Sequence, residues 1–237
     1  MGLIIRCNDA TFTNTVGIAA YPLISALKGL YYLNGSSSDA VKDLSGNEND
    51  ATMNGSATFS DKVMNITGTT TSNRIATPIV DNNSVAMIAL FNPVSTNRAL
   101  FSTIKLTSPN AGFCFGNNPS NQLVLYADGT FKIVGSATAF SDTSKYYVVG
   151  AVITPTSAKI VQYNSNGLRT VASITFSAYV PSSRYVNVCG SQDSYGGNGE
   201  INAGLAAFYT GSVSDSEIER AMQFTYEYAK KLGLSLT

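Results

Sequence analysis

Short apolar segments separated by turns rich in Gly, Asn and Asp follow one another through most of this chain of 237 residues. Segments of this length, several with alternating apolar and polar residues, are typical of antiparallel strands. Their regular spacing indicates a sandwich or a barrel. The predicted strands are Leu30–Leu33, Arg74–Ile79, Val85–Phe91, Ala99–Ile104, Gly112–Phe115, Leu123–Tyr126, Thr130–Val134, Tyr146–Ile153, Ala158–Tyr163, Leu168–Phe176, Tyr185–Cys189 and Ile201–Tyr209.

The segments outside this region predict a simple domain organisation. Residues 1–29 form an N-terminal arm, with a strand at Leu3–Arg6 and helical turns within Ile18–Leu27. Residues 30–213 form one β-sandwich, a size that a single domain can reach. Residues 214–237 form a helix packed on the sandwich: Ser214 and Glu217 make a capping box, and Gly233 ends the helix. Asp128-Gly129 and Asn166-Gly167 have the composition of tight hairpin turns.

The charge composition excludes several classes of function. Charged residues make up 13% of the chain, against about 25% in an average domain, and the net charge is zero. No basic patch suits the phosphate backbone of a nucleic acid, and no apolar run is long enough for a membrane span. A polar but weakly charged surface suits a chain whose neighbours in an oligomer cover much of it.

The chemistry of the chain argues against an enzyme. There is no His, which removes the usual general base and most transition-metal sites. No predicted strand carries the alternating carboxylates of a glycosidase, although that remains the one catalytic option. Glu217 and Glu219 lie on the first turn of the predicted helix and do not share a face.

Three widely spaced cysteines, Cys7, Cys114 and Cys189, indicate free thiols and not a disulfide framework. Met1–Cys7 does not fit a secretory signal. Both observations lead us to expect a protein assembled in a reducing cytoplasm.

The order of several segments resembles the concanavalin A-like, laminin G-like jelly-roll family. The aromatic strand Leu30–Leu33 precedes a turn of the form Asp-x-Ser-Gly-Asn-x-Asn at Asp43–Asn49, and a strand ends in a proline corner at Ala86–Pro93. The hairpin Lys145–Asn164 follows, and the last strand, Ala206–Tyr209, leads into a helix that begins Ser-Asp-x-Glu-Ile. The chain departs from the family in having no Trp, and Tyr31, Phe91 or Tyr147 would take those core positions.

This resemblance implies an all-β fold of two antiparallel sheets in a jelly-roll sandwich. Together with the polar composition, it suggests a non-catalytic bacteriophage virion protein of the tail or tail fibre, assembled in the host cytoplasm. Asn8–Gly17 is similar to the opening of some phage and prophage tail proteins. The expected partners are other virion proteins and host-surface glycan, in a homo-oligomer such as a trimer. The alternatives are a capsid decoration or tail-sleeve protein without a ligand, and a glycan-binding adhesin domain.

Two segments are candidates for ligand binding. The loop 192–200 combines carboxylates, an amide and an aromatic ring, the groups that hold and stack on sugars; its candidate residues are Asp193, Tyr195, Asn198 and Glu200. A second candidate comprises Asn118 and Tyr126, with Asn117 and Asn121 nearby.

The turn Asp43–Asp50 offers oxygen ligands to calcium, but it lacks the EF-hand spacing. Asp and Asn in such turns more often bond their own backbone. We therefore expect no required cofactor, with calcium at this turn as the alternative.

Overall fold

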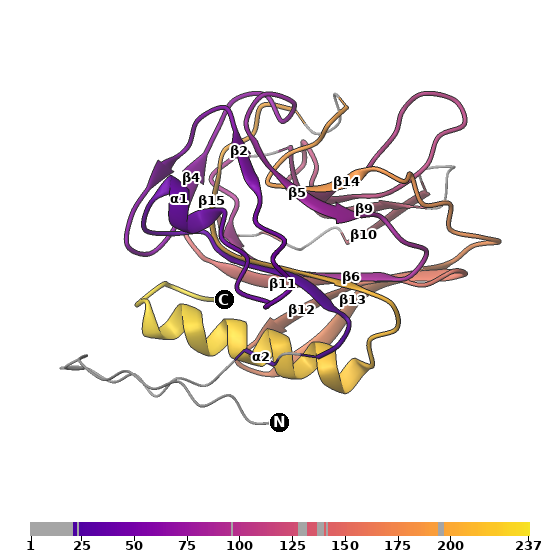
Figure 1. Cartoon of the computed structure of the whole chain (residues 1–237). Coiled ribbons are helices and arrows are strands. Elements are labelled where there is room, and N and C mark those ends of the chain that lie inside the picture. Colours follow the sequence, from indigo (N-terminus) through magenta and orange to yellow (C-terminus); the bar gives the residue numbers. More distant parts are fainter. Residues whose placement is uncertain are drawn as a thin grey trace.

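The chain folds into two antiparallel sheets and a C-terminal helix (Figure 1). The structure, a computed structural model, describes residues 21–22, 24–95, 97–127, 132–136, 140, 142–193 and 197–237. Sheet A has eight strands, with the path β13-β12-β11-β6-β15-β4-β3 and β1 paired to β15. Sheet B has seven strands in the order β10-β9-β8-β7-β14-β5-β2. The predicted all-β sandwich is confirmed.

The strands of sheet A are β1 Leu27–Tyr32, β3 Thr58–Phe59, β4 Met64–Ile66, β6 Val85–Asn92, β11 Tyr147–Ile153, β12 Ser157–Asn164, β13 Gly167–Thr175 and β15 Ile201–Thr210. Those of sheet B are β2 Thr52–Asn54, β5 Arg74–Val80, β7 Arg98–Ser102, β8 Cys114–Asn117, β9 Leu123–Ala127, β10 Lys132–Ser136 and β14 Tyr185–Val188. The helices are α1 Ser37–Ala40 and α2 Asp215–Lys231.

The main core lies between the two sheets. Alternate residues of each strand point into it, because successive side chains of a strand face opposite ways. It contains all three aromatics that we expected at its centre, Tyr31, Phe91 and Tyr147. Aromatic packing with defined edge-to-face contacts therefore fills a core that contains no Trp.

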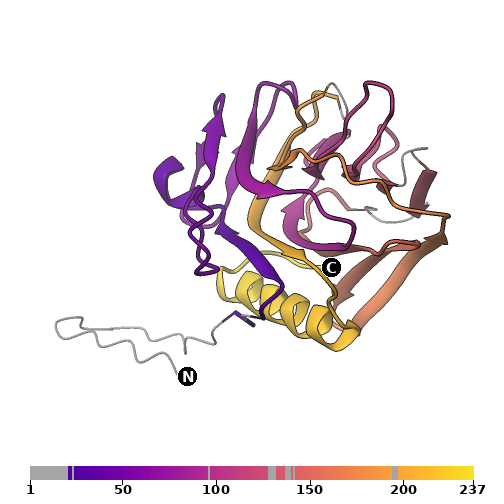
Figure 2. The same ribbon diagram turned by 45° about the vertical axis from the view of Figure 1, so that its right-hand side comes forward.

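A second core lies between α2 and the outer face of sheet A, the face turned away from sheet B (Figure 2). Ile218, Ala221, Met222 and Ala229 pack from the helix onto residues of β6, β12 and β15. Strand β6 is buried along its whole length because both of its faces are covered. The predicted helix and its capping box are confirmed, with Ser214 accepting from the Glu217 N–H.

Some local predictions were wrong or incomplete. The short strands β2, β3 and β4 and the one-turn helix α1 were missed. No helical turn is found in the described part of Ile18–Leu27; instead, β1 begins at Leu27, inside the predicted arm. In the β12–β13 hairpin the turn is Ser165-Asn166, and Gly167, with φ of 93°, opens β13.

Leu3–Arg6 and Asp128-Gly129 lie outside the described residues. Within the described part of the chain, no helix is long and apolar enough to cross a membrane.

Candidate functional site

A pocket of about 460 Å³ opens on the outer face of sheet B, the face that α2 does not cover. Its floor comes from alternate residues of three neighbouring strands: Ala99 on β7, Cys114 and Gly116 on β8, and Val124 and Tyr126 on β9. The residues between them, such as Phe115 and Leu125, point into the main core. The strand alternation thus yields a floor of small side chains beside one tyrosine ring.

Three loops form the walls of the pocket. Thr69–Thr71 precede β5, Asn117 ends β8 and is followed by Asn118 and Pro119, and Gly197 and Asn198 precede β15. Asn97 and Arg98 complete the lining. The walls are therefore almost entirely hydroxyl and amide groups.

Gly116 lets strands β7 and β8 approach each other closely at the floor. A Cβ atom there would lie 2.1 Å from the Arg98 carbonyl oxygen and 2.8 Å from Ala99 Cα. Any larger residue would have to push the two strands apart.

The buried side chain of Arg98 connects the loops that form the pocket walls. Its side chain is completely buried, and its guanidinium donates to the carbonyl oxygens of Gly68 (2.8 Å), Asn73 (2.7 Å), Cys189 (3.0 Å) and Gly199 (2.7 Å). One side chain therefore fixes both the loop 68–73 and the loop before β15. Burial lowers the pKa of Arg98, yet a guanidinium stays protonated in proteins.

The structure brings together residues from both predicted segments. Asn118, Tyr126 and Asn198 all line the pocket. Asn118 also stabilises its own turn, because its Oδ1 accepts from the N–H groups of Ser120 (3.0 Å) and Gln122 (2.9 Å). Asn198 is exposed at the rim.

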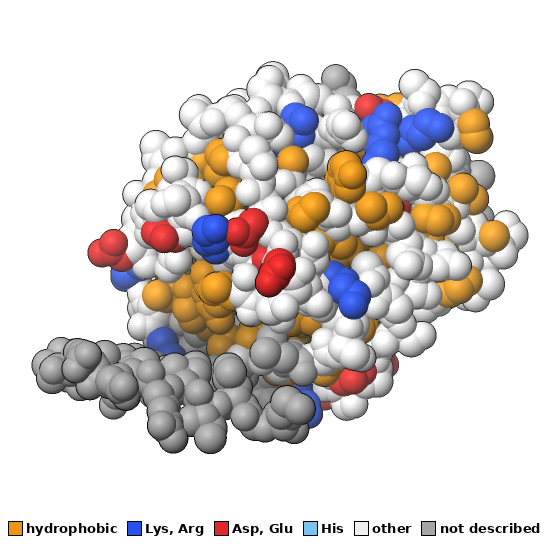
Figure 3. All heavy atoms as spheres, in the orientation of Figure 1, with side chains coloured by type: hydrophobic (Ala, Val, Ile, Leu, Met, Phe, Trp, Pro, Cys, Tyr) orange, Lys and Arg blue, Asp and Glu red, His pale blue; other side chains and the backbone are white. Residues whose placement is uncertain are grey.

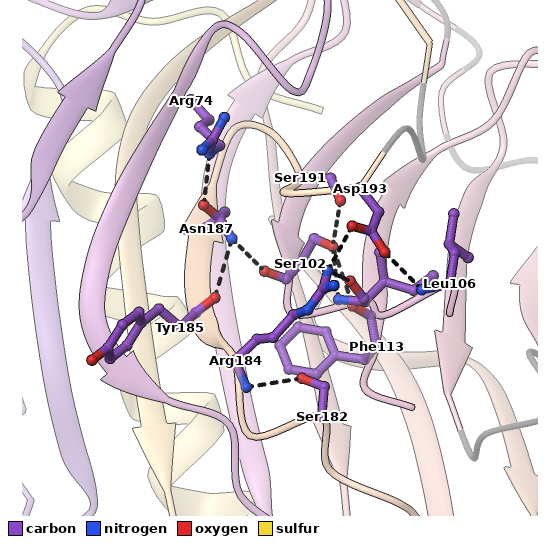
Figure 4. A network of polar contacts seen from close by, with 11 residues as sticks. Arg74, Ser102, Leu106, Phe113, Ser182, Arg184, Tyr185, Asn187, Ser191 and Asp193 are labelled. Atoms are coloured by element: carbon purple, nitrogen blue, oxygen red, sulfur yellow. Dashed lines mark hydrogen bonds and ion pairs between the residues drawn. The ribbon is translucent and has the colours of Figure 1, made fainter. Parts of the chain in front are cut away.

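Asp193 does not line the pocket. Its carboxylate forms an ion pair with Arg184 (2.8 Å) and accepts from the Leu106 N–H (2.7 Å), within the polar network of Figure 4. Partial burial acts to raise the pKa of Asp193, but the bonds from Leu106 and Arg184 outweigh it and lower the value. Asp193 therefore holds its own loop against the loop that follows β7.

Glu200 also lies outside the pocket lining. Its Oε1 accepts from Asn65 Nδ2 (2.8 Å), and its N–H donates to Ser95 Oγ (2.6 Å). Tyr195 falls outside the described residues.

The turn Asp43–Asp50 is stabilised by its own hydrogen bonds. The Asp43 carboxylate accepts from the N–H groups of Leu30, Ser45 and Asn49 and from Ser45 Oγ. The described residues contain no group of three or more Cys, Asp or Glu that could hold a metal ion. The arrangement agrees with a turn-stabilising role for Asp43.

Cys114 and Cys189 are free and buried. Burial raises the pKa of each thiol to about 12, which makes both poor nucleophiles at neutral pH. Cys7 lies outside the described residues.

Sequence reasoning missed Arg98 and the threonine wall. Arg98 reads as an ordinary cation before a strand, and no motif marks Thr69–Thr71. Figure 3 shows only a few charged side chains on the face of the molecule that it presents, some of them in small groups.

No protein-family model matches the sequence, and no curated protein matches it. Solved structures do resemble the fold. Domain 4 of an extracellular arabinanase from Geobacillus stearothermophilus, in complex with arabinotriose, has a TM-score of 0.59 and 14% identity, covering 83% of this chain and 98% of that one. The ligand binding domain of botulinum neurotoxin serotype D, in complex with N-acetylneuraminic acid, has a TM-score of 0.59 and 10% identity, covering 84% and 51%.

Trypanosoma rangeli sialidase in complex with sialic acid has a TM-score of 0.60 and 13% identity, covering 90% of this chain and 34% of the enzyme. The chain therefore spans about half of the toxin domain and a third of the sialidase. At such low identities, these likenesses show the β-sandwich fold.

Proposed function

We propose that this chain is a non-catalytic carbohydrate-binding β-sandwich domain whose site is the pocket on the outer face of sheet B. The observation that carries the proposal is the lining: a floor of small residues, one tyrosine ring, and walls of threonine and asparagine side chains. Sugars present both hydroxyl groups and apolar ring faces, and such a pocket offers partners for each.

The chemistry of the lining favours binding over hydrolysis. Glycoside hydrolysis uses a pair of carboxylic acids on either side of the scissile bond. The residues described as lining the pocket include no Asp or Glu. Asp193 and Glu200, the nearest candidates from the sequence, bond to Arg184 and Asn65 instead.

The similar structures support the same proposal. The arabinanase domain, nearly all of which this chain covers, was solved with arabinotriose. The toxin domain was solved with N-acetylneuraminic acid, but half of that chain has no counterpart here. A role in a phage virion, with virion partners and an oligomer, stays a prediction that no finding supports.

Two tyrosines on the same sheet give a matched test. Tyr126 lines the pocket, whereas Tyr185 is 58% exposed and does not. In a glycan array followed by titration calorimetry, Tyr126→Ala should weaken binding of the selected glycan about tenfold, the loss of roughly 1.4 kcal/mol of ring contact. Tyr185→Ala should leave the affinity within about twofold.

The titration has a clear negative outcome. If the folded wild-type chain binds no neutral or acidic glycan on the array, the proposed function is rejected. Equal losses for the two variants would place the binding site outside this pocket.

A further inference from the structure

The pocket has an uneven charge distribution that the proposed function does not explain. Among its described lining residues, Arg98 is the only charged one. Asp193 pairs with Arg184, and Glu200 bonds to Asn65, so the two acidic residues of the adjoining loop have their own partners outside the lining.

The charge of Arg98 has no anionic partner among the described residues. Among the described residues, its guanidinium donates to four backbone carbonyl oxygens, those of Gly68, Asn73, Cys189 and Gly199. Carbonyl dipoles satisfy the N–H groups but leave the unit charge uncancelled. Because the guanidinium is completely buried, mobile ions screen it less than they screen a surface charge.

A second guanidinium, that of Arg74, bonds to the same wall of the pocket. Arg74 donates through Nη1 to the carbonyl oxygen of Thr71 and through Nε to Asn187 Oδ1 (3.0 Å). Thr71 lines the pocket. The wall 68–73 is thus held by two arginines from behind, and neither forms an ion pair with a described carboxylate.

We infer that the pocket selects an acidic sugar, one whose ring carries a carboxylate, and holds that carboxylate against the wall Thr69–Thr71. This inference rests on the proposed function and narrows its ligand class. The hydroxyl groups of Thr69 and Thr71 and the amides of Asn97 and Asn198 offer hydrogen-bond donors toward the anion. The buried guanidinium of Arg98 and the half-buried guanidinium of Arg74 supply the favourable potential.

The expected preference is moderate. Coulomb attraction between unit charges about 8 Å apart at an effective dielectric constant near 20 corresponds to a preference on the order of tenfold or more. The ligand carboxylate loses part of its hydration on binding, which holds the net preference near that figure.

Comparing each acidic sugar with its methyl ester tests the contribution of the carboxylate to binding. The probes are N-acetylneuraminic acid and digalacturonic acid, each titrated beside its methyl ester, with arabinotriose as a neutral sugar. At least one acid should bind about tenfold more tightly than its ester, since esterification removes the negative charge and leaves the sugar ring unchanged.

An isosteric substitution then tests the pocket itself. Asn198→Asp places a negative charge at the rim, and Asn166→Asp makes the same change in the exposed β12–β13 turn, outside the lining. Asn198→Asp should weaken the acid at least about fivefold more than it weakens the ester or arabinotriose, because all three lose the amide donor and only the acid also meets a like charge. Asn166→Asp should change none of them.

The outcomes separate this inference from the proposed function. Equal affinities for each acid and its ester, or an equal fold loss of acid and ester in Asn198→Asp, would overturn the acidic-sugar inference and leave a neutral carbohydrate site. Absence of binding to every probe and to a broad glycan array would reject both.

Discussion

Arg98 shows how one buried side chain can organise a surface site. Its four carbonyl partners lie in three separate stretches of the chain, and three of them, Gly68, Asn73 and Gly199, adjoin the loops that form the pocket walls. Sequence alone placed Arg98 just before a strand, but nothing in the local pattern shows that a cation will turn inward. That part of the site depends on contacts between residues far apart in sequence.

Replacing Arg98 with Met should destabilise the fold by at least about 3 kcal/mol, because buried carbonyl oxygens would lose their donors. Denaturant unfolding measures this loss. Arg220, an exposed arginine on α2, is the control, and Arg220→Met should stay within about 0.5 kcal/mol of wild type. Similar small effects for both variants would contradict the role given to Arg98.

Asp81 is a buried carboxylate that fastens the segment before β14. It accepts from Thr103 Oγ1 (2.8 Å), Tyr179 OH (2.9 Å) and the Ser182 N–H (2.9 Å). Burial outweighs these bonds and raises the pKa of Asp81 above its ordinary value of 3.8. The folded state therefore binds this proton more tightly than the unfolded state.

The sign of the pH effect follows from that shift. The stabilisation linked to the Asp81 proton is complete below pH 3.8 and is lost as the pH rises through the raised pKa. The difference in unfolding free energy between wild type and Asp81→Asn should shrink over that interval and then stay constant, as followed by urea unfolding across the pH range. A difference that grows with pH would show that the pKa is lowered instead.

At the scale of elements, the long strands and the terminal helix were predictable because their signals are local. β6 reads as a continuous apolar run since sheet A is covered on both sides, and α2 carries a capping box and an apolar stripe. The strands β2, β3 and β4 have two or three residues each, too few to show a period. The pocket needed the register of β7, β8 and β9, which sequence alone does not supply.

The close contact between β7 and β8 leads to a second stability prediction. Gly116→Ala should cost about 1–3 kcal/mol, because its Cβ collides with the Arg98 carbonyl, and it should also abolish glycan binding. Val124→Ala, on the same floor, should lose stability but keep the pocket open. Thermal unfolding and glycan titration of both proteins test this, and normal binding by Gly116→Ala would contradict it.

At the scale of the whole molecule, β6 joins two cores. Met87, Ala89 and Phe91 face the main core, while Ala86 and Ile88 face α2. Because one strand contributes to both, the sandwich and the helix should unfold together. The position of α2 also explains the position of the site. The helix covers the outer face of sheet A and leaves the outer face of sheet B accessible.

Neighbouring positions on α2 test this coupling. Met222 is completely buried against sheet A, and Gln223 is exposed. Met222→Asp should lower the stability of the entire domain by about 3 kcal/mol or more, in one shifted transition, since a carboxylate would enter an apolar core. Gln223→Asp should be nearly neutral. Circular dichroism and tyrosine fluorescence should report the same midpoint, and two separate transitions would show that the cores are independent.

Gly116 has no side chain, and it lies on the floor of the pocket where β7 and β8 approach each other closely. Distant chains of the same ancestry can therefore be sorted at a single position before any assay is run. Those that keep glycine there can retain the close approach of β7 and β8 at the pocket floor, and those that have gained a methyl group or more must hold the two strands further apart.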